Sequence, residues 1–252
     1  MKERRKIAII TGGNKGIGKG IAIELNENGY NIVIAARDEK AGNDLVKQLN
    51  LKSGQNYFFK TDVSSKFQIE ETVKKTFSLF NHIDLLVNNA AIVIDSPFLN
   101  LEEAIWDKTI DINLKGYFLF SQAVANIMVS NNIKGKIINI TSVQGVTVWP
   151  LVPHAPYEVS KAGIIMLTKQ LAFELAKYGI TVNAVGPGPT ATEILEPWTK
   201  NPEKMKSITE KIPLGRIATP EDVANAVSFL SSDKSDYLTG ITIFVDGGRM
   251  TW

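Results

Sequence analysis

The chain has 252 residues, 44% of them hydrophobic, and a formal net charge of +2. This length and composition suit one large globular domain, and so small a net charge does not favour nucleic acid or an anionic membrane as a partner. There is no cysteine and the two histidines, His82 and His154, lie far apart in sequence, so a disulfide framework and a thiolate nucleophile are excluded and we expect no bound metal.

The amino-terminal stretch MKERRK is basic and leads into an apolar run at residues 7–10. That run is too short for a signal-peptide core or a membrane span. We therefore expect a soluble, cytoplasmic protein with no membrane partner.

Apolar, β-branched runs recur along the chain and predict strands at residues 6–11, 31–36, 56–63, 83–90, 135–142, 180–185 and 241–248. Their continuous apolar content suits strands covered on both faces, and the stretches between them have helical spacing. We predict a single domain over residues 1–252 of the α/β class. Its architecture is a Rossmann-type doubly wound parallel sheet of about seven strands with helices on both faces.

The first predicted strand runs into the glycine-rich stretch TGGNKGIGKG, residues 11–20, which then becomes a helix. A P-loop would need Ser or Thr where Gly20 stands, whereas a dinucleotide-binding loop fits the glycines present. We favour the dinucleotide loop; the alternative is a turn with a purely structural role. The residues predicted to bind the cofactor here are Gly12, Asn14, Lys15, Gly16, Ile17 and Gly18.

The second predicted strand ends at Ala36, in the place where an NAD site has an acidic residue for the ribose hydroxyls. Arg37 follows, and Lys15 lies in the glycine loop. Cations suit a 2′-phosphate, although both could be solvated surface charges. We predict that NADP(H) is preferred over NAD(H).

Tyr157 and Lys161 are four residues apart, so a helix that begins near Pro156 places them on one face. The spacing alone can occur by chance. The glycine loop, Asn88-Asn89-Ala90, Asn113, Ser142, Tyr157-x3-Lys161 and Pro187-Gly188 together resemble the classical short-chain dehydrogenase/reductases in order and approximate spacing. The resemblance runs from the first predicted strand to the last.

The resemblance implies a catalytic set, which is Asn113, Ser142, Tyr157 and Lys161. Tyr157 would be the general acid or base, and the Lys161 ammonium, with the oxidised nicotinamide, would lower its pKa. Lys161 would also bind the nicotinamide ribose, Ser142 would orient the substrate oxygen, and Asn113 would hold a relay water.

The resemblance also implies further cofactor contacts, at Asp62, Val63, Asn89, Ala90, Pro187, Gly188, Thr190 and Thr192, besides Tyr157 and Lys161. The alternative for each residue is a purely structural role, as a helix cap, a turn residue or a buried polar group. Helices near residues 102–132 and 157–178 usually form subunit interfaces in the family, which implies a homotetramer.

Two features depart from the family pattern: Ala91 replaces the usual glycine, and the Ser142–Tyr157 spacing is about two residues longer than is common. Segments 143–156 and 190–216 should rim the substrate site. The candidate substrate residues are Ser142, Gln144, Trp149, Leu151, Tyr157 and Trp198. Ile194 and Leu195 add apolar surface, which favours an alicyclic, aromatic or acyl ketone, unless these groups only anchor the loop.

The predicted function is an NADP-dependent carbonyl reductase that acts on CH–OH groups, with a small-molecule carbonyl or alcohol as substrate. One alternative is a 3-oxoacyl-thioester (carrier-protein) reductase, although Ile133 and Tyr178, beside Lys134 and Lys177, stand where such reductases have arginines. A non-catalytic dinucleotide-binding sensor or scaffold, and a polyproline ligand formed by the prolines of residues 150–156, are further alternatives.

Overall fold

The strands of the computed structural model, which describes residues 4–150, 152–193, 195–196 and 200–251, form one parallel sheet. Its seven strands lie in the order β3-β2-β1-β4-β5-β6-β7. They are β1 (Lys6–Thr11), β2 (Tyr30–Ala36), β3 (Tyr57–Lys60), β4 (Leu85–Asn88), β5 (Lys136–Ile140), β6 (Thr181–Pro187) and β7 (Thr242–Val245). The predicted fold class is confirmed.

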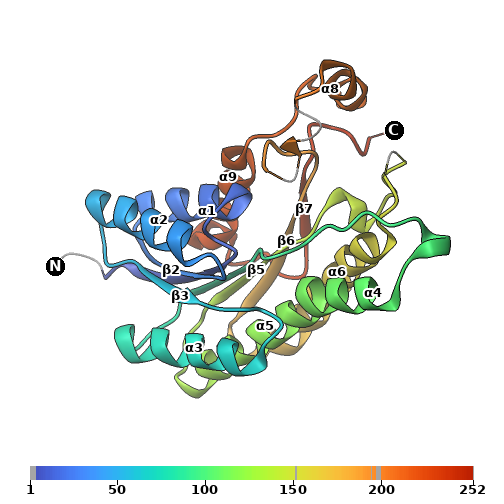
Figure 1. Ribbon diagram of the computed structural model, residues 1–252. Coiled ribbons are helices and arrows are strands. Elements are labelled where there is room, and N and C mark those ends of the chain that lie inside the picture. The colour runs from blue at the N-terminus through green and yellow to red at the C-terminus, as the bar shows by residue number, and fades with distance from the viewer. Residues whose placement is uncertain (1–3, 151, 194, 197–199, 252) are drawn as a thin grey trace.

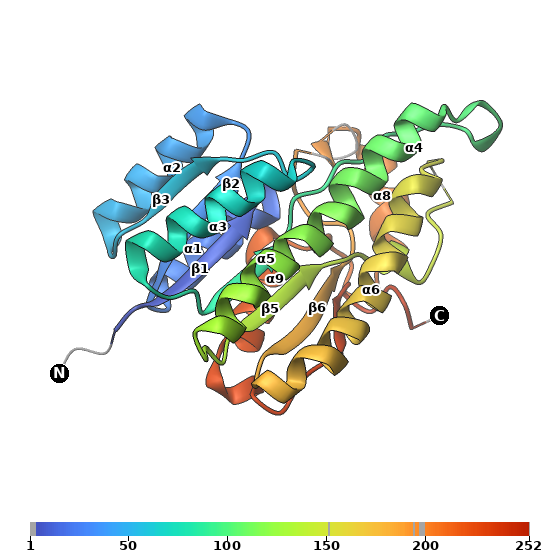
Figure 2. The same ribbon diagram turned by 90° about the horizontal axis from the view of Figure 1, so that it is seen from below.

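Helices cover both faces of the sheet (Figures 1 and 2). One apolar core joins the sheet to α1 (Gly16–Glu27), α2 (Glu39–Lys52) and α9 (Pro220–Ser231). A second core joins the other face to α3 (Lys66–Phe80), α5 (Gly116–Ser130) and α6 (Ala155–Leu175). The shorter helices α4 (Glu103–Ile110) and α8 (Pro202–Thr209) lie toward the carboxyl ends of the strands.

Four strands end earlier than their apolar runs predicted, namely β3, β4, β5 and β7. The β3 ladder stops at Lys60, opposite Ala36, and the β4 ladder stops at Asn88, opposite Asn139. Beyond these points the backbone turns, because Asp62 N donates to Gln68 Oε1 and Asn89 N donates to Thr11 Oγ1. The residues that leave the ladder lie at the carboxyl edge of the sheet, where ligands bind in open α/β folds.

Helix α6 begins at Ala155, so Pro156 lies in its first turn as the sequence predicted. A proline is tolerated there because its missing N–H would have no helical partner. The acidic side chain of Glu158 lies in the same turn, where the helix dipole favours negative charge. Tyr157 and Lys161 are therefore carried by the first turns of a rigid helix.

Helices α4 and α5 are joined by one turn of π-helix, Asp111–Lys115. Such turns are rare and are found often at functional sites. Asn113 lies in this turn and is buried.

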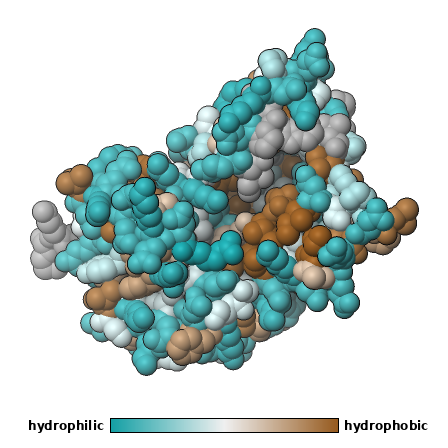
Figure 3. Space-filling view, viewed as in Figure 1, coloured by the Kyte–Doolittle hydropathy of each residue, from teal (hydrophilic) through white to brown (hydrophobic). Residues whose placement is uncertain are grey.

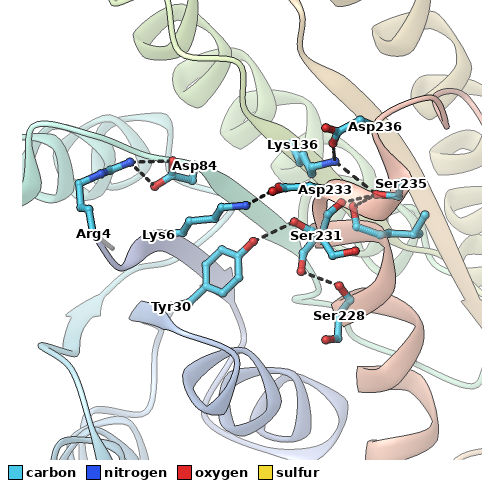
Figure 4. Close-up of polar contacts among 12 residues, drawn as sticks. Arg4, Lys6, Tyr30, Asp84, Lys136, Ser228, Ser231, Asp233, Ser235 and Asp236 are labelled. Atoms are coloured by element: carbon cyan, nitrogen blue, oxygen red, sulfur yellow. Dashed lines mark hydrogen bonds and ion pairs between the residues drawn. The ribbon is translucent and has the colours of Figure 1, made fainter. Parts of the chain in front are cut away.

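Polar contacts tie the amino edge of the sheet to the end of α9 (Figure 4). Lys6 Nζ lies 2.6 Å from Asp233 Oδ1, and Lys136 Nζ lies 2.6 Å from Asp236 Oδ1. The Tyr30 hydroxyl donates to the carbonyl of Ser231 at 2.9 Å in a buried position. This edge is opposite to the one where the carboxyl ends of the strands meet.

No helix within the described part of the chain is both long and apolar enough to cross a membrane.

Replacement of Tyr30 by Phe is expected to lower the free energy of unfolding by about 1 kcal/mol, because it removes a buried hydrogen bond while the ring stays packed. Urea denaturation measures the change. Tyr237→Phe is the matched control, since Tyr237 is fully exposed and should change nothing. Equal stability of the two variants would contradict the assigned hydrogen bond.

Candidate active site

A cavity of about 590 Å³ opens at the carboxyl edge of the sheet. Its walls come from the turns that follow β1 to β6, and from the start of α6. Figure 3 shows the hollow below α8, with hydrophobic side chains gathered beside it. The described residues that the sequence predicted at the site all line this cavity, with the exception of Asn113.

The glycine-rich turn forms one end of the cavity. Gly12 and Gly16 have φ angles of +62° and +50°, in the left-handed region that favours glycine. A Cβ on Gly18 would lie 2.3 Å from the carbonyl oxygen of Gly12, so this position has no room for a side chain. Helix α1 begins here without a side-chain cap, which leaves its first N–H groups for an anion. These residues fit the pyrophosphate of a dinucleotide.

Asn89 and Thr11 hold the glycine turn against the end of β4. Asn89 Nδ2 donates to the carbonyls of Thr11 and Gly12, at 3.0 and 3.2 Å. The Thr11 hydroxyl oxygen accepts from the backbone N–H groups of Asn89 and Ala90. Asn89 therefore has a structural role in addition to its predicted contact with the cofactor, and its partner is Thr11, the first residue of the glycine-rich stretch.

The cations predicted for a 2′-phosphate lie at this end of the cavity. Lys15 and Arg37 both line it, and Ala36 is buried. Burial raises the pKa of Asp62, but hydrogen bonds from Ser64 and the charge of Arg37 outweigh this and hold the pKa below its usual value. Asp38, which sequence reasoning missed, also lines the cavity, and its carboxylate caps α2 by accepting from Ala41 N at 3.0 Å.

Tyr157, at the start of α6, and Ser142, after β5, both line the cavity, and Ser142 is close enough to act on the pKa of Tyr157. Burial raises the pKa of Tyr157, Ser142 opposes this rise, and the charge of Glu158 adds to it. Burial outweighs the opposing effect of Ser142, and the lowering expected from Lys161 together with the oxidised nicotinamide stays a prediction.

The Lys161 side chain is buried beneath Tyr157. Its Nζ donates to the carbonyl of Ile140 at 2.8 Å and lies 5.5 Å from the centres of the Tyr117 and Tyr157 rings. Burial lowers the pKa of Lys161 to about 7. The Tyr117 hydroxyl donates to the same carbonyl at 3.1 Å, a partner that the sequence did not predict.

Asn113 is buried, and both ends of its amide pair with the backbone of Ile92. Its Oδ1 accepts from Ile92 N and its Nδ2 donates to Ile92 O, each at 2.9 Å. Nδ2 also donates to Ser160 Oγ at 3.3 Å. The π-turn thus connects the segment after β4 with α6, and the relay-water role of Asn113 stays a prediction.

Only some of the residues predicted at the substrate end of the cavity are among those that the structure describes. Gln144, Trp149, Val152 and Leu195 line the cavity, whereas Leu151, Ile194 and Trp198 lie outside the described residues. The Trp149 ring also packs in a small core with Ile208 and Ile212, and the guanidinium of Arg249 lies 4.3 Å from its centre. Trp149 therefore both lines the cavity and anchors the loop, the two alternatives that the sequence left open.

Two sequence comparisons decide the family. Residues 12–250 match the sequence model of the family described as enoyl-(acyl carrier protein) reductase. The chain is 40% identical over 245 residues to a 3-oxoacyl-[acyl-carrier-protein] reductase, FabG, of Staphylococcus epidermidis, covering 96% of this chain and 98% of that protein. The chain belongs to the classical short-chain dehydrogenase/reductase family. A 3-oxoacyl-[acyl-carrier-protein] reductase of Synechocystis is 38% identical over 247 residues, covering 97% of each chain.

Solved structures of other short-chain dehydrogenase/reductases have the same fold. One from Mycobacterium marinum gives a TM-score of 0.93 at 33% identity, covering 97% of this chain and 95% of its own. An actinorhodin polyketide ketoreductase, solved with NADPH, gives a TM-score of 0.92 at 31% identity and covers 100% of both chains. The family predicted from the sequence is thus confirmed, and the chain is an oxidoreductase.

Lys161 should make the stability of this short-chain dehydrogenase/reductase depend on pH. Between its folded pKa of about 7 and its ordinary value of 10.5, the unfolded chain binds a proton that the folded chain has released, so stability rises with pH. From pH 7 to pH 9 the free energy of unfolding should rise by about 2 kcal/mol more in the wild type than in Lys161→Met.

Urea denaturation at both pH values measures this difference. Lys169→Met changes an exposed lysine of the same helix and should keep the wild-type pH dependence. If Lys161→Met also kept it, the buried Lys161 would not be its source.

Proposed function

We propose that residues 1–252 form one dinucleotide-binding and catalytic domain that uses NADPH to reduce a ketone to a secondary alcohol, or NADP⁺ in the reverse direction. The observation that carries this proposal is that Ser142, Tyr157 and the buried Lys161 meet in the same cavity as the glycine-rich turn, with Lys161 Nζ 5.5 Å from the centre of the Tyr157 ring. The FabG relatives and the NADPH-bound ketoreductase support it.

Tyr157 is the proton donor in the direction of reduction. Its raised pKa keeps the phenol protonated near neutral pH, and the Ser142 hydroxyl holds the phenol oxygen and the substrate carbonyl in one hydrogen-bonded group. When bound, NADPH supplies the hydride. Lys161, with a pKa of about 7, is close to both charge states at neutral pH and can return a proton to Tyr157 after each turnover.

The cofactor is held from the glycine turn to the start of α6. The N–H groups of the turn bind the pyrophosphate, and Lys15 with Arg37 bind the 2′-phosphate. Asn89 fixes the turn from the other side of the cavity. NADP(H) is therefore the preferred cofactor.

Among ketones, a 3-oxoacyl thioester is the substrate class with the best support. Two relatives at 38–40% identity are named as 3-oxoacyl-carrier reductases and match over nearly their whole length. Ile133 is buried and cannot replace an arginine, and the exposed Lys134 and Lys177 precede β5 and β6, at the edge of the sheet opposite to the cavity.

The working form is a cytoplasmic homotetramer. Helices α5 and α6 lie side by side on one face (Figure 2) and carry exposed large apolar side chains, Phe118 on α5 and Met166 and Phe173 on α6. Apolar surface of this extent is typical of faces covered by another subunit.

Tyr157→Phe is expected to lower the turnover of a 3-oxoester about 10²- to 10⁴-fold, because the ring remains but the proton donor is lost. NADPH oxidation measures turnover, and fluorescence titration measures NADPH binding, which should persist. Tyr178→Phe is the control, since this tyrosine is exposed on η4 (Ala176–Tyr178). Full activity of Tyr157→Phe would contradict its assignment as the proton donor. A wild type that binds NADPH but reduces no ketone would instead support a non-catalytic dinucleotide sensor.

Arg37→Ala should weaken NADPH binding about tenfold or more and leave NADH binding nearly unchanged, because only NADPH carries the 2′-phosphate. Dissociation constants for both cofactors measure this. Lys40→Ala removes an exposed cation three residues away, outside the cavity lining, and is the control. An equal loss for both cofactors in Arg37→Ala would contradict the assignment.

A further inference from the structure

His154 lies in the cavity next to the catalytic tyrosine and has no part in the proposed reaction. It is buried, and its ring meets the Tyr157 ring edge-on at 5.6 Å between centres. Its Nδ1 lies 3.3 Å from Asp95 Oδ1, and its Nε2 lies 2.8 Å from Gln144 Oε1. Asp95, Gln144 and His154 all line the cavity.

This cluster is fixed by backbone contacts. Ser96 N donates to the carbonyl of Pro153 at 2.8 Å, which joins the segment after β4 to the loop before α6. Glu158 Oε1 accepts from Trp149 N at 2.8 Å and lies 3.7 Å from His154 Nε2. The Gln144 backbone N–H donates to Ser142 Oγ at 3.1 Å, so Gln144 is tied to the residue that orients the substrate carbonyl.

The hydrogen bonds around His154 determine how Gln144 presents its amide. An amide oxygen can only accept, so His154 Nε2 is the donor to Gln144 Oε1 at 2.8 Å, and the Asp95 carboxylate lies 3.3 Å from Nδ1 on the other side of the ring. The amide oxygen of Gln144 is thereby used, and its Nε2 has no hydrogen-bond partner among the residues that the structure describes.

We propose that Gln144, oriented by His154 and Asp95, donates a hydrogen bond from Nε2 to a second acceptor oxygen of the substrate, and that the substrate carries this oxygen close to its ketone. The inference rests on the proposed ketone reduction and deepens it. A thioester or ester carbonyl two bonds from the ketone carbon provides such an oxygen. Gln144 is then a specificity-determining residue, and His154 is a positioning residue.

The test compares ethyl 3-oxobutanoate with heptan-2-one, which has methylenes in place of the ester. The measured quantity is the ratio of their kcat/KM values with NADPH, because an intrinsic difference in reactivity then cancels between variants. Gln144→Leu should lower this ratio about tenfold, mainly through KM for the oxoester. Gln170→Leu, which changes an exposed glutamine of α6, should keep the wild-type ratio.

His154→Phe keeps a ring against Tyr157 but removes both nitrogens. In His154→Phe the ratio should fall as it does in Gln144→Leu, through a higher KM for the oxoester with kcat and the KM for heptan-2-one nearly unchanged, and in His82→Phe it should follow the wild type. If Gln144→Leu does not fold, Gln144→Glu has nearly the same size and replaces the NH₂ donor with an acceptor, so the ratio should fall in the same direction.

The outcomes separate the two proposals. A wild type that reduces neither ketone overturns the proposed function and this inference with it. A wild type that reduces both, with the same ratio in Gln144→Leu and Gln170→Leu, overturns this inference alone. A wild-type ratio in His154→Phe, or a fall that comes through kcat for both ketones, overturns the positioning role of His154.

Discussion

The site depends on how helix α6 is fixed to the end of strand β5. Two contacts fix it: Lys161 Nζ donates to the carbonyl of Ile140, and the Thr141 hydroxyl donates to the carbonyl of Lys161. The approach is so close that a Cβ on Gly145 would lie 2.9 Å from the Lys161 carbonyl oxygen. Tyr157, one turn before Lys161, is held over the cavity by this packing and meets Ser142 there.

The cost of this arrangement is a buried amine, because taking an ammonium out of water disfavours its charged form. In this fold the buried amine is that of Lys161, and it has two effects. The amine anchors α6 to the sheet, and in the proposed reaction its lowered pKa suits it to carry a proton to a phenol that burial keeps protonated. Structure and chemistry therefore depend on the same side chain.

The fold could be predicted because strands covered on both faces are continuous apolar runs, and these alternate with helical spacing. The pairing of Tyr157 with Lys161 followed from a helix start at Pro156, whereas their roles came from the family resemblance. The position of His154 beside Tyr157 could not be predicted, since a single histidine in a proline-rich loop belongs to no recognisable motif. Its partner Asp95 is 59 residues away in sequence, and only tertiary folding brings them together. The pairing of Asn113 with Ile92 was hidden for the same reason.

The contacts at the amino edge of the sheet have a consequence for how this chain can change. The bonds of Lys6, Tyr30 and Lys136 to the end of α9 lie at the opposite ends of the strands from the cavity. Effects of substitutions that share no partners are close to additive. Substitutions at this edge can therefore raise the free energy of unfolding without disturbing the cavity. The added stability can then offset destabilising replacements around Trp149 and Gln144 when a new substrate is selected. The contacts that add stability thus lie at the amino ends of the strands, and the residues that line the cavity lie at the carboxyl ends.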